Sequence, residues 1–116
     1  MKELKSIFTN EMDRCLFTSL CVNIERHHVF GGTHRAKSEK YNFIVPLHRD
    51  IHPNGAFCRT KLWPDIDHWL KRKCQEFYIE VAHYGTRADW LREFGRFYDD
   101  RANEKVSIDK TFKWRL

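Results

Sequence analysis

The spacing of the apolar residues changes near residue 64, and this change constrains the fold more than any other feature. From there on, large apolar residues recur at steps of three and four, as on one face of a helix. They are Ile66, Trp69, Leu70, Phe77, Tyr78 and Val81. We expect a helix over about residues 64–83, with Pro64 in its first turn. Before residue 60, short apolar runs alternate with His, Gly and turn residues, which predicts strands and loops. The pattern indicates the α+β class.

A second helix is predicted to start at Thr86. Asp89 follows three residues later, which is a capping-box spacing: the Thr hydroxyl and the Asp carboxylate pair with backbone N–H groups at the helix start. Gly85 is a stop signal for the preceding helix, and Gly95 is one for this helix. The expected apolar face comprises Trp90, Leu91 and Phe94. Helical spacing makes core packing the expected role of the aromatic residues in this half, rather than stacking on nucleic-acid bases.

The first half contains two predicted strands. One runs from Val22 to Ile24 and leads into His27 and His28, and the other covers residues 42–47. Pro46 has no backbone N–H, so it is expected at a sheet edge or at the strand end. The stretch that follows Gly31 and Gly32 is expected to be a loop joining the two strands.

Length and charge restrict the class of protein. The chain has 116 residues, which suits a single domain, and nine Phe, four Tyr and four Trp can fill its core. Its net charge of +5 favours polyanionic partners, nucleic acid before anionic membranes. No run of 18 apolar residues occurs, so we expect no membrane span, and the charged start does not resemble a signal peptide. Four Cys without a CxxC pair indicate reduced thiols and a cytoplasmic location.

Histidines gather in one part of the sequence. Five of the seven lie between residues 27 and 52. In an extended segment, His27 and His28 point to opposite sides, so one can bind a metal while the other faces a substrate. His48 and His52 are four residues apart and would share one face of a short helical turn. An imidazole from the strand and one from this turn can meet at one cation. Taken singly, each His could equally be an ordinary core or surface residue.

These residues together carry a resemblance to a known family. The matching positions are residues 25–32, then Arg35, Ser38, Glu39, Tyr41 and Asn42, then residues 45–47, His52, Asn54 and Gly55. In this order they resemble small phage-encoded HNH endonucleases, which belong to the His-Me finger group. The resemblance covers about residues 13–58, and residues 84–98 resemble the C-terminal part of the same group.

The resemblance implies a fold. It is a ββα-metal finger, two strands and a helix around one divalent ion, followed here by two or more C-terminal helices. We expect the finger over about residues 13–58, a helical part over about residues 64–98 and a basic tail over residues 99–116. All three would form one domain of residues 1–116.

The resemblance also implies an activity, the hydrolysis of DNA phosphodiester bonds that leaves 5′-phosphate and 3′-hydroxyl ends. His28 matches the general base, His27 and His52 match the metal ligands, and Asn42 matches the residue that fixes the loop and the base. The chemistry suits these residue types, because a neutral imidazole can accept a proton from water near pH 7. A bound divalent cation acts as a Lewis acid on the phosphate. Two His ligands with open positions are compatible with Mg²⁺, Mn²⁺, Zn²⁺ or Ni²⁺.

Cationic residues near the expected finger are candidate contacts to DNA phosphates. They are Arg26, Arg35, Lys37 and Lys40. The alternative is an ordinary solvated loop, and the balance favours DNA contact for Arg35 and is even for Lys37 and Lys40. Similar phage proteins are linked with genome packaging, which makes packaging proteins candidate partners.

The chain departs from the family at a zinc knuckle. Many relatives hold a structural zinc with two CxxC pairs, whereas the four matching positions here are Cys15, Thr18, His48 and Ile51. Because two ligands are missing, we expect no structural zinc there. Apolar packing of Phe17, Leu20 and Ile51 would hold the knuckle instead. His48 is expected to be a surface residue or a remnant of the knuckle rather than a third ligand.

Two other functions stay open on the sequence alone. A non-catalytic, zinc-stabilised DNA-binding module would use the His residues only for structure, and it would need a closed set of four ligands. A protein-interaction domain could use the aromatic helices, but it leaves His27, His28 and Asn42 without a purpose. Oligomeric state is equally open.

Overall fold

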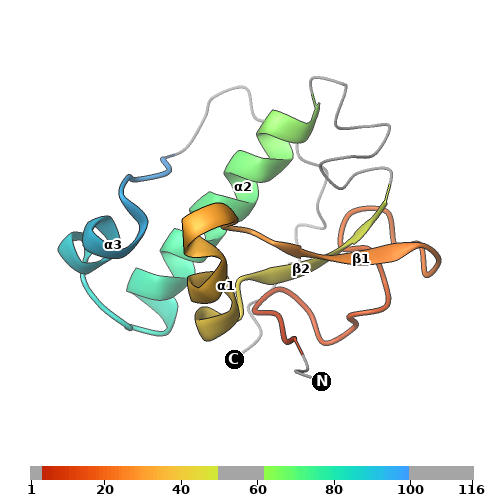
Figure 1. Cartoon of the computed structure of the whole chain (residues 1–116), viewed down its shortest axis with the longest axis horizontal. Coiled ribbons are helices and arrows are strands. Elements are labelled where there is room, and N and C mark those ends of the chain that lie inside the picture. The colour runs from red at the N-terminus through yellow and green to blue at the C-terminus, as the bar shows by residue number, and fades with distance from the viewer. Residues whose placement is uncertain (1–3, 50–61, 100–116) are drawn as a thin grey trace.

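The computed structural model describes residues 4–49 and 62–99, and it confirms the α+β class (Figure 1). The elements in chain order are β1 (Ile24–His28), the 3-10 helix η1 (Gly32–His34), α1 (Arg35–Tyr41), β2 (Ile44–His48), α2 (Leu62–Glu76), the π-helix η3 (Phe77–Val81) and α3 (Arg87–Phe94).

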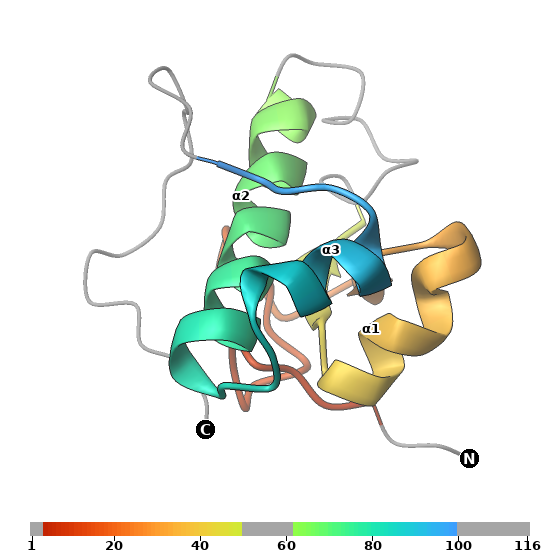
Figure 2. The same ribbon diagram turned by 90° about the vertical axis from the view of Figure 1, so that its left-hand side faces the viewer.

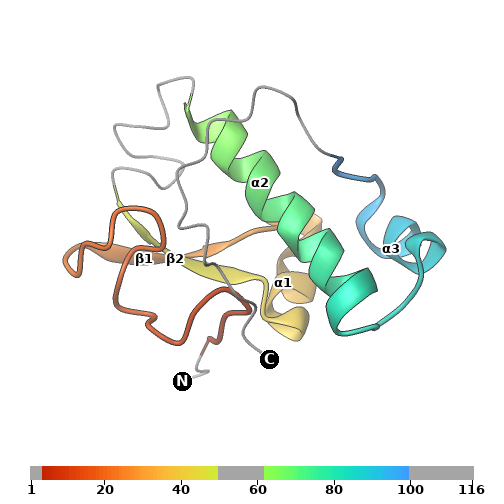
Figure 3. The same cartoon turned by 180° about the vertical axis from the view of Figure 1, so that it is seen from behind.

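Strands β1 and β2 form an antiparallel sheet in which Ile24 pairs with His48 and His28 pairs with Ile44. Helix α2 crosses one side of the sheet (Figure 3), and α1 lies on the other side of β2 from α2 (Figure 2). The first strand starts two residues later than predicted, because Asn23 has a left-handed backbone with φ of 53°.

Pro46 lies in the middle of β2, opposite Arg26. Its carbonyl oxygen accepts a hydrogen bond from Leu16 N (3.0 Å), so its backbone points away from β1. At such a position of an antiparallel pair, the backbone N–H does not take part in the hydrogen bonds between the two strands. Proline, which lacks this group, therefore costs the sheet no hydrogen bond. The sequence prediction of an edge position is therefore confirmed, with the N-terminal segment against that edge.

The prediction of a loop after Gly31 is wrong, because this stretch forms η1 and α1. Helix α1 has seven residues, of which only Ser38 and Tyr41 are buried. So short a helix has too little apolar periodicity to be recognised from sequence. It ends at Asn42, which adopts the left-handed conformation with φ of 61°.

Helix α2 and its continuation η3 carry the predicted apolar stripe. Its members Ile66, Trp69, Leu70, Phe77 and Tyr78 are buried, and Val81 is partly buried. The sequence pattern does not predict the π-helical form of the last part of this helix. The helix widens into η3, where Ala82 N donates to Phe77 O (2.8 Å). It stops at His83, whose φ is 53°.

Gly85 therefore does not end the helix through its backbone conformation. It is needed for space, because a Cβ at this position would lie 2.7 Å from the Asp89 Cβ and 2.9 Å from the Tyr78 hydroxyl oxygen. Gly85 thus permits the start of α3 to pass close to η3.

Helix α3 starts and ends as predicted. Thr86 Oγ1 accepts from Asp89 N (3.2 Å), and Thr86 N donates to Asp89 Oδ2 (2.8 Å), so both halves of the capping box are present. Gly95 ends the helix with φ of 84°. The predicted apolar face is correct for Trp90 and Phe94 but wrong for Leu91, which is exposed.

The core is aromatic and joins the two halves of the chain. Phe30, which follows β1, contacts the rings of Phe43, Trp90, Phe94 and Tyr98. Trp90 and Phe94 stack with their ring centroids 4.1 Å apart. The prediction that the aromatic residues of the helices pack in the core is confirmed for Trp69, Phe77, Trp90 and Phe94.

The residues after α3 return along α2. Tyr98 N donates to Gln75 Oε1 (2.7 Å), and His68 Nε2 donates to the Asp99 carbonyl oxygen (2.5 Å). Across residues 4–49 and 62–99, no helix combines the length and apolar character required to span a membrane.

Candidate functional site

His27 and His28 lie at the end of β1 and have different surroundings. The His27 ring is buried, and its centroid lies 5.3 Å from that of Trp63 on α2 in an edge contact. His28 Nε2 lies 3.3 Å from Glu39 Oε2 on α1. The pair thus points toward two different helices, which agrees with the alternation expected for an extended segment.

A buried hydroxyl fixes α1 to the chain that follows β1. Ser38 Oγ accepts from Phe30 N (2.9 Å) and donates to Phe30 O (2.8 Å). Backbone bonds extend this connection, because Phe43 N donates to Ser38 O (2.8 Å) and Val29 N donates to Phe43 O (3.0 Å). Glu39 follows Ser38 directly, so these hydrogen bonds also fix the backbone from which Glu39 contacts His28.

Glu39 is the residue of this site that sequence reasoning missed as a functional group. It belongs to the positions that carry the family resemblance, but the resemblance implies no separate role for it. It follows His28 by eleven positions, and the two meet only because α1 folds back on β1. The weak periodicity of α1 left no local signal of this contact.

Asn42 lies at the end of α1 and is exposed. Its backbone N–H donates to Glu39 O (3.4 Å), and its carbonyl oxygen accepts from Ile7 N (3.0 Å). The residue therefore ends the helix that carries Glu39 and binds the N-terminal segment. A catalytic role for its side chain stays a prediction.

The two expected metal ligands stand differently in the structure. His27 is a buried imidazole at the edge of Trp63, whereas His52 lies outside the described residues. Among residues 4–49 and 62–99, no three His, Cys, Asp or Glu side chains come together as a metal-binding group. His48 is the last residue of β2 and is buried, so the expected helical turn and surface position are both wrong for it. The alternative expectation, a remnant of the zinc knuckle, stays a prediction.

The chemistry of the donor set bears on the fit of a metal. His27 supplies a buried imidazole at the end of β1, and imidazole is a common ligand of Mn²⁺, Zn²⁺ and Ni²⁺. His52, the other expected ligand, lies outside the described residues, so the described part of the chain supplies one of the two expected donors.

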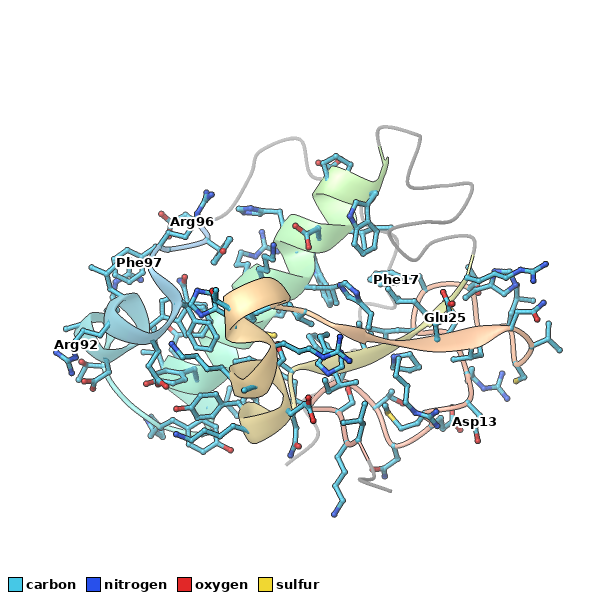
Figure 4. The ribbon with its side chains drawn as sticks, in the orientation of Figure 1. Asp13, Phe17, Glu25, Arg92, Arg96 and Phe97 are labelled. Atoms are coloured by element: carbon cyan, nitrogen blue, oxygen red, sulfur yellow. The ribbon has the colours of Figure 1, made fainter. Side chains whose placement is uncertain are left out.

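Arg26 and Arg35, two of the candidate DNA contacts, are exposed. Arg26 lies on β1 and forms an ion pair with Asp13 (3.2 Å). Asp13 lies on the side of the molecule that is away from α3 (Figure 4). Arg35 is the first residue of α1. An exposed ion pair contributes little to stability, so Arg26 can exchange Asp13 for a phosphate at low cost.

The other two candidates, Lys37 and Lys40, lie on α1. Lys37 Nζ donates to the carbonyl oxygen of Glu93 and thereby connects α1 with α3. Lys40 is exposed, and its Nζ lies 5.0 Å from the centroid of the Tyr41 ring. The structure thus gives Lys37 an internal contact and leaves the ammonium of Lys40 at the surface.

The expected zinc-knuckle region is a hydrogen-bonded turn. Cys15 N donates to Leu20 O (2.8 Å), Ser19 N donates to Cys15 O (3.0 Å), and Leu16 N fixes the turn to β2. Phe17 packs against Trp69 of α2, so the apolar role expected of Phe17 is confirmed, with a partner outside the turn. The same prediction is wrong for Leu20, which is exposed, and Ile51 lies outside the described residues.

A second polar cluster joins three helical elements. The Tyr41 hydroxyl donates to Glu93 Oε1 (2.8 Å) and Oε2 (2.7 Å), and the Tyr78 hydroxyl donates to Glu93 Oε2 (2.6 Å). Burial and the bond to Glu93 raise the pKa of Tyr41 to about 12, and the same causes raise the pKa of Tyr78. Burial alone would raise the pKa of Glu93, but the bonds from Tyr78 and Tyr41 lower it overall, assisted by the charges of Lys40 and Lys37.

Comparison with known proteins found no match: no family model, no curated protein and no solved structure is similar to this chain.

Proposed function

We propose that this protein is a metal-dependent DNA endonuclease of the HNH type, built on a ββα-metal finger, that hydrolyses phosphodiester bonds with His28 as general base. One observation carries the proposal. His27 and His28 extend from the end of one strand toward different helices, His28 beside a carboxylate and His27 beside the start of α2. This observation supports the proposal because the two adjacent histidines, which would act as general base and metal ligand, have different surroundings.

Each group has a defined task in this proposal. His28 accepts a proton from the attacking water, for which a neutral imidazole is suited near pH 7. His27 and His52 hold a divalent cation, which when bound supplies a Lewis acid for the phosphate. Arg26, Arg35 and Lys40 are exposed and contact the DNA backbone. Lys37 contributes less, because its ammonium is engaged with α3.

The test is cleavage of supercoiled plasmid by the purified chain with Mg²⁺, Mn²⁺, Zn²⁺ or Ni²⁺. We expect nicking that stops when a chelator removes the metal. A His28→Ala variant should lose about 100-fold or more of the rate, which is the usual contribution of a general base. The matched control is His83→Asn, which changes an exposed His at the end of η3. Asn tolerates the left-handed backbone at this position, so activity should be unchanged.

Two results would contradict the proposal. Equal cleavage by the wild type and His28→Ala would remove His28 from the mechanism. DNA binding without cleavage under every metal would favour the non-catalytic zinc-stabilised module instead. Circular dichroism of each variant separates loss of activity from loss of fold.

A further inference from the structure

We propose that Glu39 is a positioning residue that fixes the tautomer of His28, so that Nε2 carries the proton and Nδ1 is the nitrogen that accepts one. The inference deepens the proposed function, on which its catalytic consequence rests, because it names the ring atom that acts as base. The tautomer itself is a property of the chain alone.

The donor and acceptor inventory leads to this assignment. An ionised carboxylate can only accept hydrogen bonds, whereas a neutral imidazole has one donor and one acceptor nitrogen. Glu39 Oε2 lies 3.3 Å from His28 Nε2, so the hydrogen bond requires a proton on Nε2. The lone pair of the neutral ring then lies on Nδ1. The same logic orients the base in catalytic triads, where the wrong tautomer is costly.

Burial makes the contact more than an ordinary surface pair. The His28 side chain is 9% exposed and the Glu39 side chain is 23% exposed. Partial removal from water strengthens an electrostatic contact, and it reduces the competition from solvent that weakens exposed pairs. Glu39 is therefore placed to determine which ring nitrogen of His28 carries the proton.

The backbone around the pair limits its freedom. Ser38, the residue before Glu39, is fully buried and bonds both polar backbone atoms of Phe30. Phe30 is two residues beyond His28. The hydrogen bonds between Ser38 and Phe30 therefore hold the backbone of Glu39 close to the backbone of His28.

Nitrogen-15 NMR of the histidine side chains tests the tautomer directly, on the full chain at mildly alkaline pH and without DNA or metal. The wild type should give His28 signals of a single Nε2–H tautomer. Glu39→Ala should give a mixture of tautomers. Glu39→Gln should keep the Nε2–H form, because the amide oxygen can accept the same proton. Glu80→Ala, which removes an exposed carboxylate from η3, is the matched control and should resemble the wild type.

Plasmid cleavage by the same variants tests the catalytic consequence. Glu39→Ala should lower the maximal rate by roughly tenfold or more while DNA affinity stays unchanged, since a wrong tautomer impairs the base and not binding. Glu39→Gln should restore part of that rate.

The failures are distinguishable. A tautomer mixture in the wild type, or an unchanged single tautomer in Glu39→Ala with a native amide spectrum, overturns the inference. If Glu39→Ala does not fold, the spectra of the wild type and Glu39→Gln decide. A mixture of His28 tautomers in the wild type overturns the inference, and a single Nε2–H tautomer in both proteins supports it. If the wild type fails to cut DNA but holds the Nε2–H tautomer through Glu39, the proposed function fails and the structural assignment stands.

Discussion

The hydroxyl of Tyr78 donates to Glu93 Oε2 across 2.6 Å and joins η3 to α3. Tyr41 at the end of α1 donates to the same carboxylate. Three elements from different parts of the chain thus meet at one side chain. The widened turn of η3 begins one residue before Tyr78, so the π-helix forms part of this junction.

Replacement of Glu93 by Gln should destabilise the protein. An amide lacks the charge that strengthens the bonds from Tyr41 and Tyr78, and hydrogen bonds to charged groups contribute about 1.5–3 kcal/mol. We expect a loss of about 2 kcal/mol in the free energy of unfolding, measured by urea denaturation. Glu80→Gln, at an exposed site on η3, is the control and should change little. A loss equal to that of the control would contradict the structural role of Glu93.

Acid should weaken this cluster in a defined direction. The pKa of Glu93 is lowered in the folded protein from an ordinary value of 4.5. Its stabilisation is therefore fully present above pH 4.5 and is lost as the pH falls through the folded pKa. The melting temperature of the wild type should drop more steeply below pH 4.5 than that of Glu93→Gln. Parallel curves for the two proteins would exclude Glu93 as the group responsible.

Tyr41 should ionise late in an alkaline titration. Its pKa of about 12 exceeds the ordinary value of 10, because burial and then the bond to Glu93 disfavour the phenolate. The associated stability is present below pH 10 and is lost as the pH rises through about 12. In a titration followed by tyrosinate absorbance, Tyr41→Phe should remove amplitude near pH 12. Removal of amplitude near pH 10 instead would contradict this contact. Tyr84→Phe, which changes an exposed ring, is the control.

Local sequence signals predicted the helical half well. The capping box at Thr86, the left-handed Gly95 and the apolar stripe of α2 each depend on residues within a few positions of one another. Leu91 shows the limit of this reasoning, because helical spacing alone does not reveal how wide the buried face is.

The remaining features depend on tertiary structure. Tyr41 and Glu93 are 52 residues apart, and His28 and Glu39 meet only through α1, which gave no clear helical signal. The two histidines at the end of β1 were correctly expected in an extended segment. Their carboxylate and aromatic neighbours could not be expected, because no local pattern encodes which helix covers which face.

Asn42 allows a test that separates backbone conformation from side-chain chemistry. It ends α1 with a left-handed backbone, a conformation that Gly adopts freely and that costs Ala about 1 kcal/mol. We therefore expect Asn42→Gly to retain nearly wild-type stability in urea denaturation and Asn42→Ala to lose about 1 kcal/mol. Equal losses in both variants would mean that the amide side chain itself stabilises the fold. If Asn42→Gly keeps its stability but cuts plasmid more slowly, the amide contributes to the proposed reaction.

Ser38→Ala should be among the more damaging single-atom deletions in the chain. The serine hydroxyl is fully buried and bonds both Phe30 N and Phe30 O, so its removal deprives two polar backbone atoms of this partner. Loss of a partner by a buried polar group costs about 1–3 kcal/mol, and we expect at least about 2 kcal/mol from urea denaturation. Ser6→Ala removes a single bond, to Phe8 N, from a half-buried site and should cost less. If the two variants lose the same stability, the Ser38 hydroxyl does not hold α1 against the end of β1, and the backbone bonds of Ser38 and Phe43 alone would fix the helix that carries Glu39.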